Sequence, residues 1–223
     1  MEFAKKSLAL ACGVAFSAAA TADYLDIAEL DDSVTCNLNT DHEYCGGENN
    51  YITDVDGSLV ESGSEVTIGN QVVANSDTPF TLTFTYLFKE AAWENSFWFQ
   101  DEELFNTQND DWEDQPSLTF TYTSGQGPLD FAFKSVTGGG DTLWTYNTEP
   151  SLNSQNFFTF QGDNFILLGL DDGGAGPDDN HDDMIIKITT SSVAVPEPGT
   201  LALLGLGLAG LVLTVRRRND SSA

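Results

Sequence analysis

Apolar and polar residues alternate along most of the interior of the chain, as in β-strands that bury one face. The segment 80–88 reads Phe-Thr-Leu-Thr-Phe-Thr-Tyr-Leu-Phe, with large apolar residues at every second position at its start. The segment 117–123 repeats this alternation, and 129–136 places Leu and Phe at alternate positions. Because successive side chains of a strand point to opposite faces, each segment predicts a strand with one buried face.

Shorter apolar segments continue this pattern, and Gly, Asn, Asp and Pro, which favour turns, separate nearly all of them. No helical period of convincing length occurs between residues 23 and 195, and 89–95 fits at most one short turn. About nine short strands separated by turns predict an all-β fold, a β-sandwich of the jelly-roll kind. The additional strand candidates are 66–74, 96–100, 142–146, 157–161, 165–170 and 184–190.

Both ends of the chain carry apolar runs of another kind. Near the N-terminus two lysines precede the apolar run 7–19, and small residues follow up to Ala22. This order of charged, apolar and small residues predicts a secretory signal peptide at 1–22, cleaved after Ala22 or, alternatively, after Ala20. A signal peptide and a C-terminal signal at 196–223 leave 23–195 as one secreted domain.

Near the C-terminus, the run 200–215 holds 16 residues without a charge. As a helix it extends about 24 Å, slightly short of the roughly 30 Å hydrocarbon core of a bilayer. The prolines at 196 and 198 lack amide donors, so the helix can begin only after them. The arginines at 216–218 favour the cytoplasmic side, which leaves the domain outside. These features predict a transmembrane helix at about 200–215, with a buried core helix as the alternative.

Together these C-terminal features resemble the PEP-CTERM sorting signal of Gram-negative bacteria. The resemblance implies export, transient anchoring in the inner membrane and processing by an exosortase. It also implies a final place at the cell surface or outside the cell, in systems often tied to exopolysaccharide and biofilm. The residues that carry the resemblance are Pro196, Glu197, Pro198, Arg216, Arg217 and Arg218.

The charge of the predicted secreted domain is strongly negative. Three of the 35 acidic residues lie outside it and three of the eight basic residues lie inside, so its net charge is 3 − 32 = −29. Such a domain repels nucleic acid and anionic lipid, so both are poor partners and we expect no nucleic-acid binding. It suits a setting rich in divalent cations, or it serves only to keep a secreted β-protein soluble. The basic residues inside are Lys89, Lys134 and Lys187.

Two cysteines remain in the secreted domain. Cys36 and Cys45 have eight residues between them, and an exported chain meets oxidising conditions, so we predict a disulfide. Closing so short a loop stabilises the fold by about 2–3 kcal/mol. A metal site built from these cysteines and His42 is the alternative.

Candidate metal chemistry concentrates in one loop. Residues 171–183 hold six carboxylates in 13 residues around a Gly-rich turn, and such crowding requires a counter-cation or full solvation. Oxygen ligands suit Ca²⁺, which takes six to eight of them. The Asp-x-Asn-x-Asp spacing opens like an EF-hand, but Gly at the sixth position and Glu at the twelfth are missing. We therefore predict a Ca²⁺ site of another kind, with a solvated acidic loop as the alternative. Its candidate ligands are Asp171, Asp172, Asp178, Asn180, Asp182 and Asp183.

The same loop resembles the end of DUF4114, a β-rich domain of unknown function found in bacterial surface proteins. That domain ends in a strand, an acidic pair, a Gly-rich turn and a second acidic motif before a final apolar strand. The resemblance covers about 80–190 and is specific in its last 25 residues, where His181 stands in place of an aromatic residue. It implies calcium at the same loop.

Catalytic motifs are scarce. The chain has no Gly-x-Ser-x-Gly elbow, and no plausible nucleophile stands beside His42 or His181. We therefore expect a non-catalytic protein of the cell surface or extracellular matrix. The alternatives are a carbohydrate-binding module for exopolysaccharide and a secreted hydrolase. A binding module would stack sugars on tryptophans, and we expect the one among acids, Trp112, to be the most exposed. The tryptophans are Trp93, Trp98, Trp112 and Trp144.

Overall fold

The computed structural model describes residues 24–40, 44–45, 47–150, 152, 155–173 and 180–193. The predicted signal peptide and the predicted transmembrane helix lie outside these residues. Within them, no helix combines the length and the apolar character that crossing a membrane requires.

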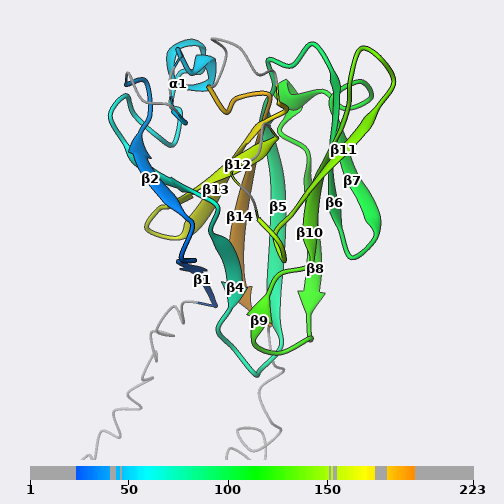
Figure 1. Ribbon diagram of the computed structural model, residues 1–223. Helices are drawn as coiled ribbons and strands as arrows, with labels where there is room; N and C mark the ends of the chain where they lie inside the picture. Colours follow the sequence, from blue (N-terminus) through cyan, green and yellow to red (C-terminus); the bar gives the residue numbers. More distant parts are fainter. Residues whose placement is uncertain are drawn as a thin grey trace, which may run out of the picture.

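Two antiparallel sheets face each other and form a sandwich, with a small third sheet at one end (Figure 1). The seven-stranded sheet has the order β2 (Val34–Asn37), β3 (Glu65–Ile68), β12 (Asn156–Gln161), β13 (Phe165–Asp171), β14 (Met184–Ser192), β5 (Phe80–Phe88) and β8 (Ser117–Tyr122). The four-stranded sheet has the order β11 (Thr142–Tyr146), β10 (Phe131–Val136), β6 (Glu94–Phe99) and β7 (Glu102–Asn106). The third sheet consists of β1 (Leu25–Ala28), β4 (Gln71–Ala74) and β9 (Gly127–Pro128). The all-β, sandwich-like prediction is confirmed, and its jelly-roll topology stays a prediction.

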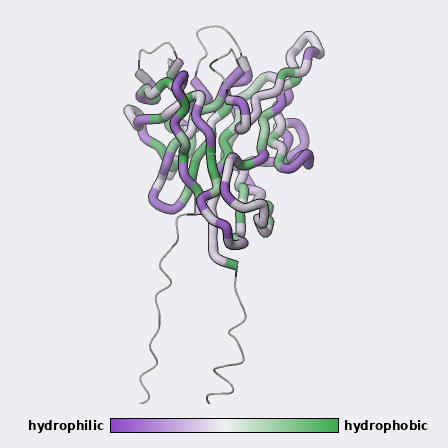
Figure 2. The backbone as a smooth tube through the Cα atoms, turned by 60° about the horizontal axis from the view of Figure 1, so that its bottom comes forward, coloured by the Kyte–Doolittle hydropathy of each residue, from purple (hydrophilic) through white to green (hydrophobic). Residues whose placement is uncertain are grey.

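The main core fills the space between the two large sheets and is rich in phenylalanine. Phe84 of β5 meets Phe97 and Phe99 of β6, with ring centroids 5.3 and 4.8 Å apart. Phe133 of β10 similarly meets Phe157 of β12 at 5.6 Å. Hydrophobic residues are concentrated in the strands, while the connecting loops are largely hydrophilic (Figure 2). The alternation in the sequence therefore predicts the inward faces of β5 and β10 correctly.

A second apolar cluster covers the outer face of the seven-stranded sheet. The short helix α1 (Asn50–Asp54) contributes Tyr51, and β12 and β13 contribute Phe158 and Leu167. Cys36 and Cys45 lie in the same cluster and form a disulfide, with Cα atoms 6.2 Å apart. The predicted disulfide is confirmed, and since each sulfur is bonded to the other, the alternative metal site is excluded.

Some predicted elements are wrong. The segment 66–74 forms two strands, β3 and β4, in different sheets. Gly69 turns the chain with φ of 81°, and Asn70 is buried and accepts a hydrogen bond from Leu30 N (3.3 Å). The predicted single strand is therefore interrupted at Gly69, because glycine adopts the left-handed backbone conformation without strain.

Several elements of the structure are not predicted from the sequence. β7 follows β6 through Gln100 and Asp101, both with positive φ (50° and 64°), as a two-residue hairpin turn demands. Because neither residue is Gly or Asn, the turn carries no strong sequence signal. The sequence also predicts none of five further elements: helix α1, the 3₁₀ turn η1 (Trp112–Asp114) and the strands β1, β2 and β9. Conversely, the short helical turn predicted within 89–95 does not form a helix.

Candidate functional site

The acidic loop lies at the edge of the sandwich where β13 ends and β14 begins, near α1 (Figure 1). The two strands pair antiparallel with Leu170 opposite Met184, and Asp183 N donates to Leu170 O (3.1 Å). This pairing brings the first residues of the loop next to its last ones. The hairpin, rather than the loop itself, therefore determines which carboxylates meet.

Three of the predicted ligands come together. Carboxylate oxygens of Asp171, Asp172 and Asp183 lie within 4.8 Å of one another. Ca²⁺ binds oxygen at 2.3–2.6 Å, so oxygens up to about 5 Å apart can share one ion. Asp171 and Asp172 are buried, with 4% and 6% of their surface exposed, and Asp183 is half-buried. Because burial strengthens the mutual repulsion of carboxylates, this group, the carboxylate triad, favours a compensating cation or proton.

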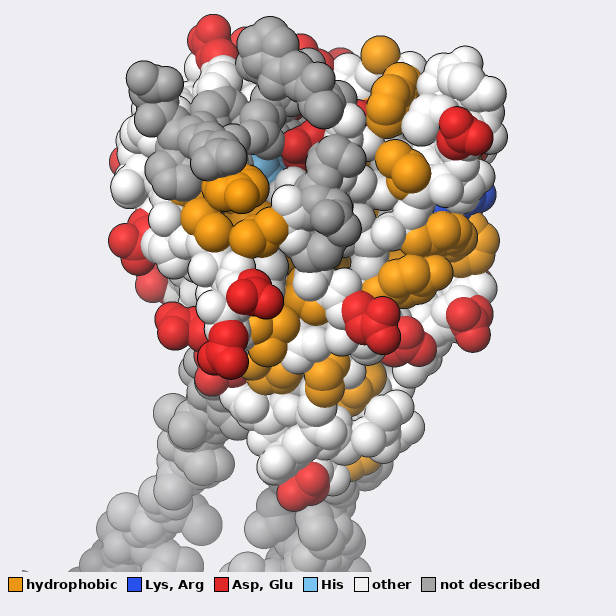
Figure 3. Space-filling view, viewed as in Figure 1, with side chains coloured by type: hydrophobic (Ala, Val, Ile, Leu, Met, Phe, Trp, Pro, Cys, Tyr) orange, Lys and Arg blue, Asp and Glu red, His pale blue; other side chains and the backbone are white. Residues whose placement is uncertain are grey.

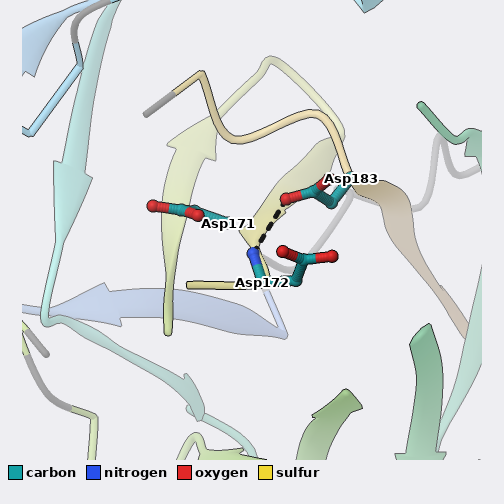
Figure 4. A group of neighbouring side chains, drawn as sticks. All are labelled: Asp171, Asp172 and Asp183. Carbon is teal, nitrogen blue, oxygen red and sulfur yellow. Dashed lines mark hydrogen bonds between the residues drawn. The ribbon is translucent and has the colours of Figure 1, made fainter. Parts of the chain in front are cut away.

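Hydrogen bonds hold the carboxylate triad in place. Asp172 N donates to Asp183 Oδ2 (2.8 Å), the contact dashed in Figure 4. Asn95 Nδ2 of β6 donates to Asp172 Oδ2 (3.1 Å), and Gly173 N donates to Asp171 Oδ1 (3.0 Å). Neutral donors stabilise each carboxylate, but the formal charge of three ionised groups stays. The triad is therefore oriented by both sheets and remains strongly negative when ionised.

The remaining predicted ligands within the described residues have other contacts. Asp182 Oδ2 accepts from Asn50 N in the first turn of α1. Asn180 Nδ2 donates to Glu48 O (3.1 Å), and Asn180 O accepts from Asn49 Nδ2 (2.7 Å). Asn180 and Asp182 therefore fasten the loop to the segment around α1. Asp178 lies outside the described residues, and metal binding by the predicted set stays a prediction.

Asp182 is an unusual carboxyl group because it is completely buried. Burial is the main cause that raises the pKa of Asp182, the hydrogen bond from Asn50 N lowers it and the nearby charges of Glu90 and Asp183 raise it, with a net value of about 8. Asp182 is therefore protonated in the folded protein at neutral pH.

This protonation makes stability depend on pH. The pKa of Asp182 is about 8 in the folded state against an ordinary value of 3.8, so between these values the folded protein holds a proton that the unfolded chain has lost. Stability from this group therefore falls as pH rises from about 4 to 8 and is constant above. We expect Asp182→Asn, which keeps an acceptor for Asn50 N, to raise the melting temperature at pH 8 more than at pH 5 in EDTA. The control Asp163→Asn changes an exposed turn residue. Melting curves of Asp182→Asn and wild type that run parallel with pH would contradict this assignment.

The tryptophans differ from their predicted exposure. Trp112 is partly buried and packs edge-on against Phe88 of the second apolar cluster, with centroids 4.9 Å apart, so its expected exposure is wrong. Trp93 and Trp98 are also partly buried. Trp144 is 39% exposed, and Tyr146, two residues further along β11, is 44% exposed. Alternation along the strand predicted at 142–146 would have placed Tyr146 beside Trp144 on one face.

Comparison with known proteins identifies the C-terminal segment. A family model of the PEP-CTERM protein-sorting motif matches residues 194–218. The predicted sorting signal is thereby confirmed as a motif, and the motif implies export and an exosortase-dependent, membrane-anchored sorting signal. No curated protein matches the chain, and no solved structure matches it. The resemblance of about 80–190 to DUF4114 stays a prediction.

Proposed function

We propose that the protein is sorted by an exosortase to the cell surface or extracellular matrix, where a non-catalytic, Ca²⁺-stabilised β-sandwich associates with exopolysaccharide in a biofilm. The sorting-motif match at 194–218 is the observation that carries this proposal. The predicted route begins with the signal peptide and includes transient anchoring in the inner membrane by the helix at about 200–215. In this proposal the β-sandwich is the secreted domain, and the C-terminal motif directs its sorting.

Calcium is the proposed ion because the carboxylate triad offers hard oxygen ligands at the spacing of one ion. The formal net charge of the chain is −27, so every bound cation also relieves repulsion across the whole molecule. The triad ties β13 to the start of β14, so an ion there would stabilise the loop edge of the sandwich. We propose a structural role for it.

A non-catalytic body is supported by where the perturbed carboxyl lies. Asp182 has the raised pKa typical of a catalytic acid, but its side chain is completely buried and bonded to the backbone of α1. A substrate cannot contact a group enclosed in this way. The raised pKa of Asp182 therefore fits a structural role.

Sorting is tested by changing the tail alone. We expect the triple variant Pro196→Ala, Glu197→Ala, Pro198→Ala to accumulate as full-length protein in the inner membrane, because the exosortase no longer processes it. Wild type should yield mostly a shorter form outside that membrane, measured by fractionation and mass spectrometry. The control Asn219→Ala, Asp220→Ala, Ser221→Ala changes three residues of the same tail beyond the matched motif. Equal size and distribution of wild type and the triple variant would overturn the proposed sorting.

A further inference from the structure

The outer face of the four-stranded sheet presents an aromatic surface to solvent. In the register of β6, β10 and β11, Trp98 lies opposite Ala132, which lies opposite Tyr146. The next row of the same face places Ser96, Lys134 and Trp144 side by side. We call Trp98, Lys134, Trp144 and Tyr146 the outer aromatic face. Hydrophobic side chains lie beside a basic one on this side of the molecule in Figure 3.

The rings of the outer aromatic face hold one another in place. Trp144 and Tyr146 are stacked, with centroids 5.7 Å apart and planes 11° from parallel. Trp98 meets Trp144 edge-on at 5.4 Å, and Trp98 Nε1 donates to Ser96 Oγ (2.8 Å). Ala132, which lies between Trp98 and Tyr146, has a small side chain and is 95% buried, so the two rings project further from the sheet than it does. Since adjacent strands are about 4.8 Å apart, the surface extends about 10 Å from β6 to β11.

Charge restricts what this surface can bind. Lys134 Nζ lies 5.7 Å from the centroid of the Trp98 ring and 5.8 Å from that of the Trp144 ring, so its positive charge repels a second cation at these rings. A polyanion would approach one lysine on a molecule of formal net charge −27, so it is repelled at longer range. An uncharged partner is favoured.

Polar groups border the rings. Glu94 and Asn106 lie along the same face beyond Ser96, and Asn106 Nδ2 donates to Glu94 Oε1 (2.9 Å) and to Glu103 Oε1 (3.4 Å). Asn106 is buried, so it orients the two glutamates, while Glu94 and Glu103 are exposed and their carboxylate oxygens can accept hydrogen bonds from hydroxyl groups. An apolar protein anchor would leave these groups and Lys134 unpaired, and such desolvation weakens binding. A ligand with apolar C–H faces and many hydroxyls satisfies both the rings and the border.

We propose that the outer aromatic face binds a neutral polysaccharide chain, whose sugar rings lie against Trp98, Trp144 and Tyr146 while their hydroxyls meet Glu94 and Glu103. Exposed aromatic side chains give large contact area at little conformational cost, which suits a weak, repeated ligand. This inference rests on the proposed matrix association and names its ligand class. It depends on neither the carboxylate triad nor the tail.

Affinity electrophoresis tests the inference on the full chain in a zwitterionic detergent without a sugar headgroup. The gels contain hydroxyethyl cellulose, xyloglucan, galactomannan or dextran, and polygalacturonate serves as the anionic comparison. We expect at least one neutral polysaccharide to retard wild type. Trp144→Ala should weaken that binding at least tenfold, and Tyr146→Ala should weaken it several-fold. Leu118→Ala, which changes an equally exposed apolar residue (40%) on the other large sheet, should leave it unchanged.

Retardation by none of the four neutral polysaccharides, or by polygalacturonate alone, would overturn the inference. Equal loss in Leu118→Ala and Trp144→Ala, with unchanged melting temperatures, would overturn the assignment to this face and favour a general apolar surface. Running the gels with EDTA and with Ca²⁺ separates this test from the proposed calcium site. Sorting has no influence on purified protein, so failure here leaves the sorting proposal untouched.

Discussion

Millimolar Ca²⁺ is expected to raise the melting temperature of the protein by roughly 5–10 °C over EDTA, whereas equal Mg²⁺ has a smaller effect. A ligand at about 100 times its dissociation constant stabilises by roughly 2.7 kcal/mol, and about 2–4 °C corresponds to each kcal/mol in a chain of this size. Mg²⁺ demands closer, near-octahedral oxygens and keeps its water, so three carboxylates spread over as much as 4.8 Å suit it less. Differential scanning calorimetry of the full chain in detergent measures both shifts.

The variant Asp183→Asn distinguishes a carboxylate triad that binds a cation from one that does not. Asparagine can still accept the hydrogen bond from Asp172 N, so the change removes a charge and little else. In EDTA we expect its melting temperature to equal or exceed that of wild type, because repulsion within the carboxylate triad falls. In Ca²⁺ we expect it to lie below wild type, because one ligand charge is missing.

Opposite signs in the two conditions form the signature of a cation site. Asp163→Asn removes a charge from the exposed turn between β12 and β13 and should shift equally in EDTA and Ca²⁺. If wild type melts at the same temperature in EDTA, Ca²⁺ and Mg²⁺, the proposed calcium site is wrong.

The strands of the sandwich could be predicted from the sequence wherever alternation is long. Phe80, Leu82 and Phe84 are all fully buried in β5, as period two requires. Short strands bounded by unusual turns could not be predicted, because Gln100 and Asp101 adopt positive φ without the Gly or Asn that signals it. In such turns the tertiary hairpin overrides local propensity.

The sequence predicts which segment holds the candidate site, but not how its carboxylates are arranged in space. Composition alone identifies the carboxylates at 171–183. Their separation into a carboxylate triad and a buried Asp182 depends on two contacts between segments distant in sequence, Asn95 with Asp172 and Asn50 with Asp182. Neither contact follows from spacing along the chain, since the partners are 77 and 132 residues apart.

Replacing Gly169 with alanine is expected to destabilise the fold severely, by about 3 kcal/mol or more, because β13 has no room for a methyl group there. A Cβ at this position would lie 2.3 Å from Phe158 Cε1 and 2.5 Å from His181 O. Phe158 is fully buried on the neighbouring strand, so its ring cannot turn away freely. His181 O is backbone, and His181 itself is buried with φ of 57° and its Nε2 2.6 Å from Asn156 Oδ1. The last residues of the acidic loop therefore lie directly against β13 because residue 169 lacks a side chain.

Urea unfolding of Gly169→Ala measures this cost, and Gly138→Ala is the matched control. Gly138 has ordinary φ, and its added Cβ would meet only Trp93 Nε1 at 3.9 Å, so we expect a change within about 0.5 kcal/mol. The double variant Gly169→Ala, Phe158→Leu should recover part of the loss, since it removes one of the two clashes and leaves the backbone one. It should also respond less to Ca²⁺ than wild type, because the remaining clash displaces His181 and with it Asp183. If Gly169→Ala is as stable as wild type, the loop does not lie against β13. The packing that positions the carboxylate triad would then be wrong.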